Sequence, residues 1–282
     1  MHNANDYSSI IDLIQSGSTC NIDLALQIAA GLSVDLVALL SPFKTLLPIP
    51  HPSIENYIQL FTASSFNWSN KNCQELPEQL FLLKNIQELN LSNNQLKSIP
   101  PQFSELHYLK HLNINRNKIS ALAFSAVHWQ NLKQLYAADN DIHELADGFN
   151  HFEQLQDLDL SRNRLKTLPS AVKYWKQLQH LHLVKNELLY LPSEMQYWQA
   201  LEWLDLSYNQ LYELPEEIGY LTNLRRLDLT YNPIDQLPDS IYELQQLEEL
   251  VLYKTNIPAV VCEELSNALP NTKVKLNFDY FF

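Results

Sequence analysis

Glycine is scarce in this chain, with only 4 glycines among 282 residues. Phosphate loops of the GxxxxGK[ST] type need glycines so that backbone amides can approach the ligand closely, and no such loop is present. The sequence also has no GxSxG nucleophile motif and no HExxH zinc motif. We therefore predict that the chain has no catalytic residues, is not an enzyme and needs no cofactor.

Cysteine is nearly as scarce. The 3 cysteines, Cys20, Cys73 and Cys262, lie far apart, and none belongs to a CxxC pair. A zinc knuckle or a dense disulfide framework would need closer, paired cysteines, so we expect reduced thiols and a cytoplasmic protein. Cys262 follows Val261 and precedes two glutamates. Because acidic neighbours raise the pKa of a thiol, we expect Cys262 to be structural rather than reactive.

Basic residues and long apolar runs are also lacking. Against 32 acidic residues stand 19 basic ones, which gives a formal net charge of −13. Affinity for nucleic acid comes mainly from Lys and Arg that neutralise phosphates, so we expect no nucleic-acid partner. The most apolar segment near the N-terminus is interrupted by Gln27, Ser33 and Asp35. We expect no signal peptide and no association with a membrane.

The chain does contain a repeat. Asparagine recurs at a constant step of 23 residues, and the pattern LxxLxLxxNxL surrounds each copy, at Asn94, Asn117, Asn140, Asn163, Asn186, Asn209 and Asn232. The LxL alternation directs one strand face inward, and a unit this short cannot enclose a core alone, so the units must stack. Each repeat should give one short parallel strand. The repeated asparagine should bury its amide against turn backbone groups that would otherwise lack partners.

In the most regular copies the pattern continues into LPxxIxxLxx, as in LPEEIGYLTN at 214–223 and LPDSIYELQQ at 237–246. Over about residues 63–278 the repeat resembles the leucine-rich repeat family, in its LPxxIxxLxxLxxLxLxxNxLxx class. The resemblance implies an α/β solenoid, a horseshoe with a parallel sheet on its concave side. It also implies a non-catalytic recognition or scaffold module that binds a protein partner, and we favour a monomer. Fold analogy does not name the partner.

Two parts are expected, with a boundary near residue 60. Residues 1–60 lack the repeat and carry four helical patterns: YSSIIDLIQSG, NIDLALQIAAG, SVDLVALL and SIENYIQLF. We interpret this region as a cap on the first repeat, because repeat arrays need their exposed end covered. The alternative is that these helices dock a partner. Residues 61–282 should form the repeat domain, with a C-terminal cap at about 261–282 that consists of a helix and a final strand.

A few copies depart from the consensus. Lys71 stands where the first, incomplete copy would have asparagine, and Thr255 replaces the asparagine of the last copy. In the middle of the array, Ala137 fills a leucine slot. A void there would be unfavourable, so we expect Phe124 or Tyr136 to fill the space.

The repeat frame predicts which side chains face outward. The third, fifth, seventh and eighth places of each motif should face out from the concave sheet. Four tryptophans, Trp68, Trp129, Trp175 and Trp198, fall in leucine slots and are expected in the core. Trp203 alone stands at the third place, so we expect it on the concave surface.

Other aromatic and charged residues accompany Trp203 in this frame. Tyr208 and Tyr231 occupy the eighth place of two neighbouring repeats, and Tyr253 occupies the seventh place of the next. Trp, Tyr and Arg are enriched in protein-binding hot spots, so we predict a partner-binding surface on the last four strands. Its predicted residues are Trp203, Tyr208, Arg226, Tyr231, Tyr253, Asp205, Asp228, His180 and His182. In the alternative interpretation, the rings only cover neighbouring strand residues.

A second alternative rests on imidazoles and carboxylates. The fifth places of adjacent repeats carry Asp159, His182, Asp205 and Asp228, with Asp157 and His180 beside them at the third place. Such groups can hold a metal or a small ligand, or transfer protons. An open ladder keeps them side by side rather than closed around a pocket. We therefore predict no metal site, and we expect a solvated face in which His182 pairs with Asp159 and Asp205.

Overall fold

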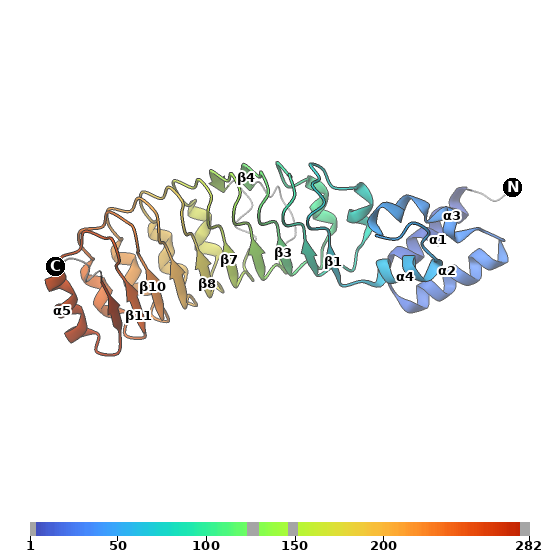
Figure 1. Ribbon diagram of the computed structural model, residues 1–282. Helices are drawn as coiled ribbons and strands as arrows, with labels where there is room; N and C mark the ends of the chain where they lie inside the picture. The colour runs from blue at the N-terminus through green and yellow to red at the C-terminus, as the bar shows by residue number, and fades with distance from the viewer. Residues whose placement is uncertain (1–3, 123–129, 146–151, 277–282) are drawn as a thin grey trace.

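The computed structural model describes residues 4–122, 130–145 and 152–276. Helices lie at the N-terminal end, and a curved array of repeats extends from them to the C-terminus (Figure 1). Parallel strands line one side of the array, and turns and short helices line the other. Trp129 and Phe124, for which the sequence predicts core positions, lie outside the described residues.

The N-terminal region contains the four predicted helices. They are α1 (Ala4–Gln15), α2 (Thr19–Gly31), α3 (Leu36–Leu39) and α4 (Ile54–Thr62), and an unpredicted 3-10 helix, η1 (Ser41–Leu46), lies before α4. Helix α4 starts with a capping box between Ser53 and Asn56, which satisfies orphan N–H groups of the first turn. None of the helices in the described part of the chain is long and apolar enough to cross a membrane.

The helical region packs directly on the first repeat. Ile14 and Phe61 are fully buried in the same hydrophobic cluster that continues through the repeats. Asn85, just before the second strand, donates through Nδ2 to the carbonyl oxygens of Phe61 at 3.0 Å and Ser16 at 3.2 Å. Gly17 has a φ of +64°, and this left-handed backbone lets the end of α1 turn tightly against Asn85. The two parts of the chain therefore share one core.

The main sheet has ten parallel strands, in the order β1-β2-β3-β5-β7-β8-β9-β10-β11-β12. They are β1 (Ser65–Asn67), β2 (Glu88–Asn90), β3 (His111–Asn113), β5 (Gln134–Tyr136), β7 (Asp157–Asp159), β8 (His180–His182), β9 (Trp203–Asp205), β10 (Arg226–Asp228), β11 (Glu249–Val251) and β12 (Lys273–Lys275). From β2 to β11 the middle residue of each strand is buried, as the LxL alternation predicts. Between β1 and β11, residues 23 positions apart pair with each other, as Trp203 does with Arg226.

Short 3-10 helices form the opposite side of the array. They are η2 (Glu78–Leu82), η3 (Pro101–Glu105), η5 (Ser170–Tyr174), η6 (Ser193–Tyr197), η7 (Glu216–Tyr220) and η8 (Asp239–Glu243), and a proline directly precedes each one. Two repeats carry Ala123 or Ala146 in place of that proline, and there the chain forms the short strands β4 (Ala121–Leu122) and β6 (Glu144–Leu145), which pair with each other. The array ends with helix α5 (Ala259–Ala268) before β12, so the helix and strand predicted at this end are present.

The repeated asparagines form the predicted buried ladder. Asn163 donates through Nδ2 to the carbonyl oxygens of Leu160 and Ala137, each at 2.9 Å, and its Oδ1 accepts from Ile142 N at 3.0 Å. The asparagine amide therefore satisfies backbone groups of its own repeat and of the preceding one. Thr255, which replaces the asparagine in the last copy, donates through Oγ1 to the carbonyl three residues earlier at 2.9 Å.

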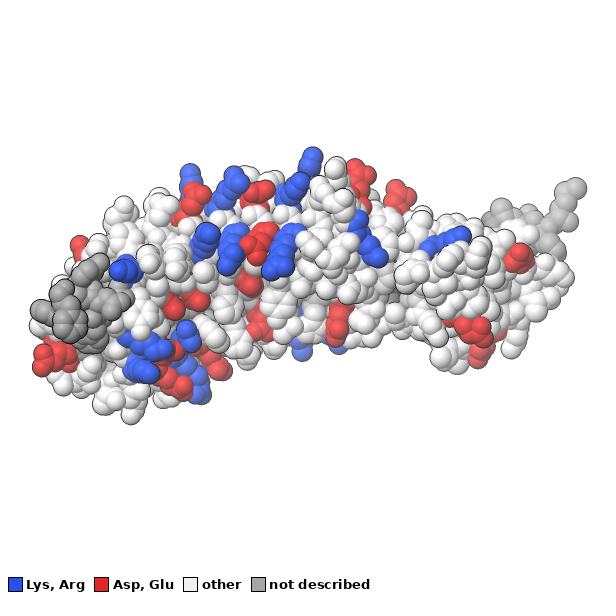
Figure 2. Space-filling model, in the orientation of Figure 1, with Lys and Arg blue, Asp and Glu red and all other residues white. Residues whose placement is uncertain are grey.

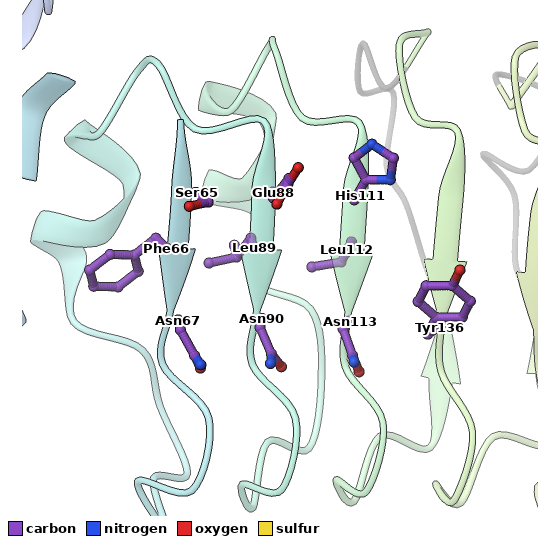
Figure 3. A pocket seen from close by; sticks show the side chains of 10 residues that line it. All are labelled: Ser65, Phe66, Asn67, Glu88, Leu89, Asn90, His111, Leu112, Asn113 and Tyr136. Carbon is purple, nitrogen blue, oxygen red and sulfur yellow. The ribbon is translucent and has the colours of Figure 1, made fainter. Parts of the chain in front are cut away.

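The described tryptophans in leucine slots lie in or against the core. Trp175 and Trp198 are fully buried and stack with ring centroids 6.0 Å apart, and Trp198 Nε1 donates to a backbone carbonyl of the preceding repeat at 2.9 Å. Trp68 is half-buried and packs against the core. The expectation that Tyr136 fills the space beside Ala137 is wrong: Tyr136 occupies the fifth place, so its side chain stands on the concave side (Figure 3).

Candidate functional site

Third-place side chains form a row of polar contacts across the concave face. Nδ1 of His111 lies 2.6 Å from Oε1 of Gln134, and Nε2 of Gln134 donates to Oδ2 of Asp157 at 2.9 Å. Oδ1 of Asp157 in turn contacts Nδ1 of His180. From β3 to β8, the third-place polar groups therefore satisfy one another.

The imidazole that pairs with a carboxylate is His180, not His182 as predicted. His180 contacts Asp157, whereas His182 packs edge-on against Trp203, with ring centroids 5.3 Å apart. Within the described ranges, neither fifth-place aspartate beside His182 forms an ion pair with it. The reason is that those aspartates are held by their own turns.

Six fifth-place side chains each accept a hydrogen bond from the backbone N–H two residues further on. The distances are 2.9–3.0 Å, at Asn67, Asn90, Asn113, Asp159, Asp205 and Asp228. This Asx turn fixes the chain where it leaves the strand. Asp205 also accepts from Ser207 Oγ at 2.7 Å, and Asp228 is buried. Both aspartates, predicted to bind a partner, therefore have a structural role.

Trp203 lies on the concave side of β9 and is half-buried, while the next residue, Leu204, is fully buried beneath the sheet. The guanidinium carbon of Arg226 lies 4.9 Å from the centroid of the indole ring, and the ring of His180 meets the indole edge-on at 6.4 Å. Nη1 of Arg226 also lies 3.0 Å from Oε2 of Glu249. The indole is thus held between neighbouring strands, and its Nε1 is buried without a hydrogen-bond partner. We call His180, His182, Trp203 and Arg226 the strand group.

The predicted tyrosines are more exposed than Trp203. Tyr208 and Tyr231 are 49% and 46% exposed, and their rings stack with centroids 4.5 Å apart, whereas Tyr253 is 37% exposed. Both stacked residues have left-handed backbone, with φ of +58° and +55°, and the same conformation occurs at the eighth place of the other repeats, at Asn93, Arg116, Asp139, Arg162, Lys185 and Lys254. Within the described residues no ring contact joins Trp203 to this stacked pair. The predicted surface therefore consists of two parts, the strand group and the turn pair Tyr208–Tyr231.

The metal-binding alternative gains no geometric support. Among the residues that the structure describes, no three His, Cys, Asp or Glu side chains come together as a possible metal site. Cys20 and Cys73 are free thiols, and burial raises the pKa of Cys73, which hydrogen-bonds to Asn94 Oδ1 at 3.2 Å. The side chain of Cys262, which we expect to be structural, lies outside the described part.

A cavity of about 250 Å³ lies at the other end of the concave face, over β1 to β5 (Figure 3). The fifth-place residues Asn67, Asn90, Asn113 and Tyr136 line it together with third-place side chains. Burial raises the pKa of the Tyr136 hydroxyl, and the negative charges of two nearby aspartates raise it further, so this group is a neutral hydroxyl. No motif marks the cavity in the sequence. Three consecutive fifth-place asparagines are the signal that could have revealed it.

Charges of both signs are mixed along the repeats (Figure 2). Near the C-terminal end, for example, Arg225 lies 2.7 Å from Glu248 and 3.6 Å from Glu202. On the face shown, acidic and basic side chains alternate instead of forming a broad area of one sign. Most of the local positive charge on this part of the repeats is therefore balanced by neighbouring carboxylates.

Solved structures of other proteins share this architecture. A leucine-rich repeat protein of Leptospira interrogans matches with a TM-score of 0.74 and 32% identity, over 78% of this chain and 56% of that chain. A TDR receptor matches with a TM-score of 0.62 and 25% identity, over 76% of this chain and 42% of that one. A chain in the octameric complex of Latrophilin 3, Unc5D and FLRT2 has the same fold, with a TM-score of 0.61 and 23% identity, over 70% of this chain and 64% of its own. The chain thus spans just over half the length of the Leptospira protein.

Models of protein families match most of the repeat array. They are described as "Leucine-rich repeat region", "Leucine Rich repeats (2 copies)" and "Leucine rich repeat", and they match residues 195–268, 84–126 and 130–188. A search of curated proteins found no match. The family matches, the asparagine ladder and the ten-stranded parallel sheet lead to one conclusion. The chain belongs to the leucine-rich repeat family.

Proposed function

We propose that this chain recognises a protein partner on the concave side of its C-terminal repeats, across strands β8 to β11. Leucine-rich repeat domains generally act as protein-interaction modules, and one similar structure is that of a receptor. The proposed contact surface consists of the strand group and the turn pair, with Tyr253 at its edge. In this proposal the chain acts by binding, and no catalytic step is involved.

The observation that carries the proposal is the exposed stacking of Tyr208 on Tyr231, with ring centroids 4.5 Å apart. Both rings are close to half exposed, and they lie on turns whose left-handed backbone is shared by the eighth-place residues of other repeats, such as Arg116 and Lys185. The turn geometry therefore belongs to the repeat, and what distinguishes these two positions is the pair of exposed aromatic rings. Such rings have the size and rigidity of binding anchors.

The strand group would supply a fixed anchor beside the turn pair. Contacts with His182 and with the guanidinium of Arg226 already hold the Trp203 side chain. Binding of a partner would therefore cost little conformational entropy at this residue. Arg226 is also close to Glu249 at 3.0 Å and to Asp228 at 3.7 Å. Because these carboxylates balance its charge, the partner needs no matching acidic group. We therefore expect binding through aromatic and apolar contacts with weak dependence on salt.

The test uses alanine variants of both parts of the surface. Immobilised wild-type protein is used to capture a partner from cells of the source organism, and the affinity of the identified partner is then measured. Trp203→Ala and the double variant Tyr208→Ala/Tyr231→Ala should each weaken binding by roughly 30-fold, the effect of a hot-spot residue worth about 2 kcal/mol.

Tyr220→Ala is the matched control. Tyr220 is 57% exposed and ends η7, on the opposite side of the repeats. The Tyr220→Ala variant therefore removes a similarly exposed ring without changing the concave face. Its affinity for the partner should equal that of the wild type. If the Trp203 and tyrosine variants also bind like the wild type, the proposed surface is wrong.

The alternative of docking through helices α1–α4 has less support. Apolar side chains of these helices, such as Ile14 and Phe61, are buried in the core that they share with the first repeat. This arrangement supports the proposal that residues 1–60 act as a cap.

A further inference from the structure

Asn67, Asn90 and Asn113 form a row of oriented amides on β1, β2 and β3. They are register partners on adjacent strands, so their Cα atoms are spaced by roughly 4.8 Å. Each Oδ1 is fixed by the turn N–H two residues further on, at 2.9–3.0 Å. The three side chains extend in the same direction at the same level of the sheet (Figure 3).

The amide nitrogens of this row are free to bind a ligand. With each oxygen held by its turn, the Nδ2 group is directed away from the turn, and all three residues line the cavity. Within the part of the chain that the structure describes, no hydrogen bond uses the Nδ2 group of Asn67, Asn90 or Asn113. The row therefore presents up to six N–H donors, because each carboxamide nitrogen carries two.

The neighbouring groups add acceptors and a neutral hydroxyl. Glu88, at the third place of β2, is exposed and has no ion-pair partner among the described residues. His111 lies beside it at the third place of β3. Tyr136 follows Asn113 in register and ends the row with a hydroxyl whose raised pKa keeps it neutral. No lysine or arginine lines the cavity.

We propose that this cavity binds a neutral oligosaccharide. A hydroxyl group both donates and accepts, so some hydroxyls of a saccharide can accept from the asparagine amides while others donate to the Glu88 carboxylate. An anionic ligand would be repelled by Glu88 and would find no cationic side chain. A metal cation would meet N–H donors instead of ligand oxygens, because the asparagine oxygens are already used by the turns.

The size of the cavity favours a small ligand over a protein surface. Its volume of about 250 Å³ is just below the roughly 300–1,000 Å³ of typical small-molecule sites. Such a volume suits a short part of a sugar chain whose remaining rings lie in solvent. The site is at the other end of the sheet from Trp203, so it goes beyond the proposed protein-binding function and can be tested separately.

The asparagine side chains allow a direct test by NMR. Titration of the ¹⁵N-labelled protein with maltohexaose, cellohexaose and fully N-acetylated chitohexaose should shift the side-chain NH₂ resonances of Asn67, Asn90 and Asn113 with at least one of these neutral probes. An oligogalacturonate, which is anionic, should leave them in place. If no neutral saccharide shifts these resonances, the proposal is overturned. If a neutral Gly-Ser peptide shifts them and the saccharides do not, the site binds polypeptide and the proposal is equally overturned.

A conservative variant tests the asparagine N–H donors without disturbing the turns that the asparagine oxygens stabilise. The double variant Asn90→Asp/Asn113→Asp keeps the oxygen that each turn needs but removes the N–H donors, and Asp159 already makes the same turn bond at the fifth place of β7. It should weaken saccharide binding at least about tenfold, which corresponds to the net loss of one strong hydrogen bond. Unchanged affinity in a folded double variant would refute the proposal.

Asn115→Asp is the control for added negative charge, although it adds one charge where the double variant adds two. Asn115 stands at the seventh place, outside the cavity, and its Oδ1 accepts from Ala138 N at 2.7 Å, a bond that aspartate preserves. It adds one negative charge close to the site without removing a donor that lines it. Its saccharide affinity should match that of the wild type. An equal loss in the control and in the double variant would assign the effect to charge and overturn the donor role.

Discussion

Trp198 and Trp203 lie on opposite sides of the same repeat. Trp198 is fully buried and its Nε1 donates to a backbone carbonyl at 2.9 Å, whereas Trp203 stands half-buried on the concave side, close to the Arg226 guanidinium. Both are tryptophans in an apolar part of the sequence. Their places in the 23-residue frame, and not their hydrophobicity, determine which one is enclosed.

Alanine substitution should therefore affect stability very differently at the two positions. Trp198→Ala should lower the free energy of unfolding by about 3–5 kcal/mol, because it leaves a large cavity and removes the hydrogen bond from Nε1 to the Val172 carbonyl. Trp203→Ala should lower it by only about 1 kcal/mol, because part of the ring is already in water. Urea unfolding followed by far-UV circular dichroism measures both. Equal losses of unfolding free energy in the two variants would contradict the repeat frame, which places Trp198 in the core and Trp203 on the surface.

The two tyrosines of the turn pair should make the protein less stable than asparagines would at the same positions. Tyr231→Asn should be nearly neutral, since relief of about 1 kcal/mol of left-handed strain is offset by the loss of a ring pair worth about 0.5–1.5 kcal/mol. Tyr208→Asn/Tyr231→Asn relieves two strained residues but loses the same single ring pair, so it should stabilise the protein by about 1 kcal/mol. Thermal unfolding tests this. Tyr220→Asn, which relieves no left-handed residue, should give no gain, and destabilisation by the double change would show that the strain is absent.

Much of the fold could be predicted because one frame governs every repeat. The positions of Asn163 and the other ladder asparagines fixed the strands, and a mistake in one copy would have conflicted with all the others. The pair β4–β6 did not follow from the frame. It occurs where Ala123 and Ala146 replace proline, so the chain before them is not diverted as in the other repeats, and pairing then depends on the neighbouring repeat.

The sequence predicted which side chains of the candidate site face outward, but not which groups they contact. The frame placed Trp203 and the tyrosines outward, yet it could not decide that His180 rather than His182 would contact a carboxylate. That choice depends on rotamers and on turn bonds that occupy the fifth-place aspartates. The left-handed backbone at Tyr208 and Tyr231 was also not predicted, because no glycine marks it. The cavity at Asn67, Asn90 and Asn113 emerged only from the three-dimensional shape.

The asparagine ladder should be a major source of stability. Asn163→Ala would leave the buried N–H of Ile142 and the carbonyls of Ala137 and Leu160 without this partner. We expect a loss of roughly 2–4 kcal/mol in the free energy of unfolding. Asn163→Thr should lose less, because Thr255 makes the own-repeat bond in the last copy. Chemical denaturation and amide exchange at Ile142 measure the difference, and a threonine variant as unstable as alanine would contradict this account.

The junction between the helical region and the repeats depends on Gly17. Its φ is +64°, and an added Cβ would overlap the Asn85 amide and lie 2.9 Å from the Phe61 carbonyl oxygen. Gly17→Ala should therefore weaken the packing of α1 and α4 on the first repeat, with a loss of about 2 kcal/mol or more. Hydrogen exchange should accelerate in α1, α4 and β1, while β8 to β11 keep their protection.

Gly31→Ala tests whether that effect is specific to the junction. Gly31 ends α2, and an added Cβ there has no neighbouring atom within 4 Å. Stability should be unchanged or slightly higher in this variant, because alanine has less conformational freedom to lose. If residues 1–60 form a cap, Gly17→Ala should also promote aggregation of the repeats, and Gly31→Ala should not. A Gly17→Ala protein that stays monodisperse while its helices exchange freely would instead show that the repeats need no cap, and it would favour a docking role for the helices.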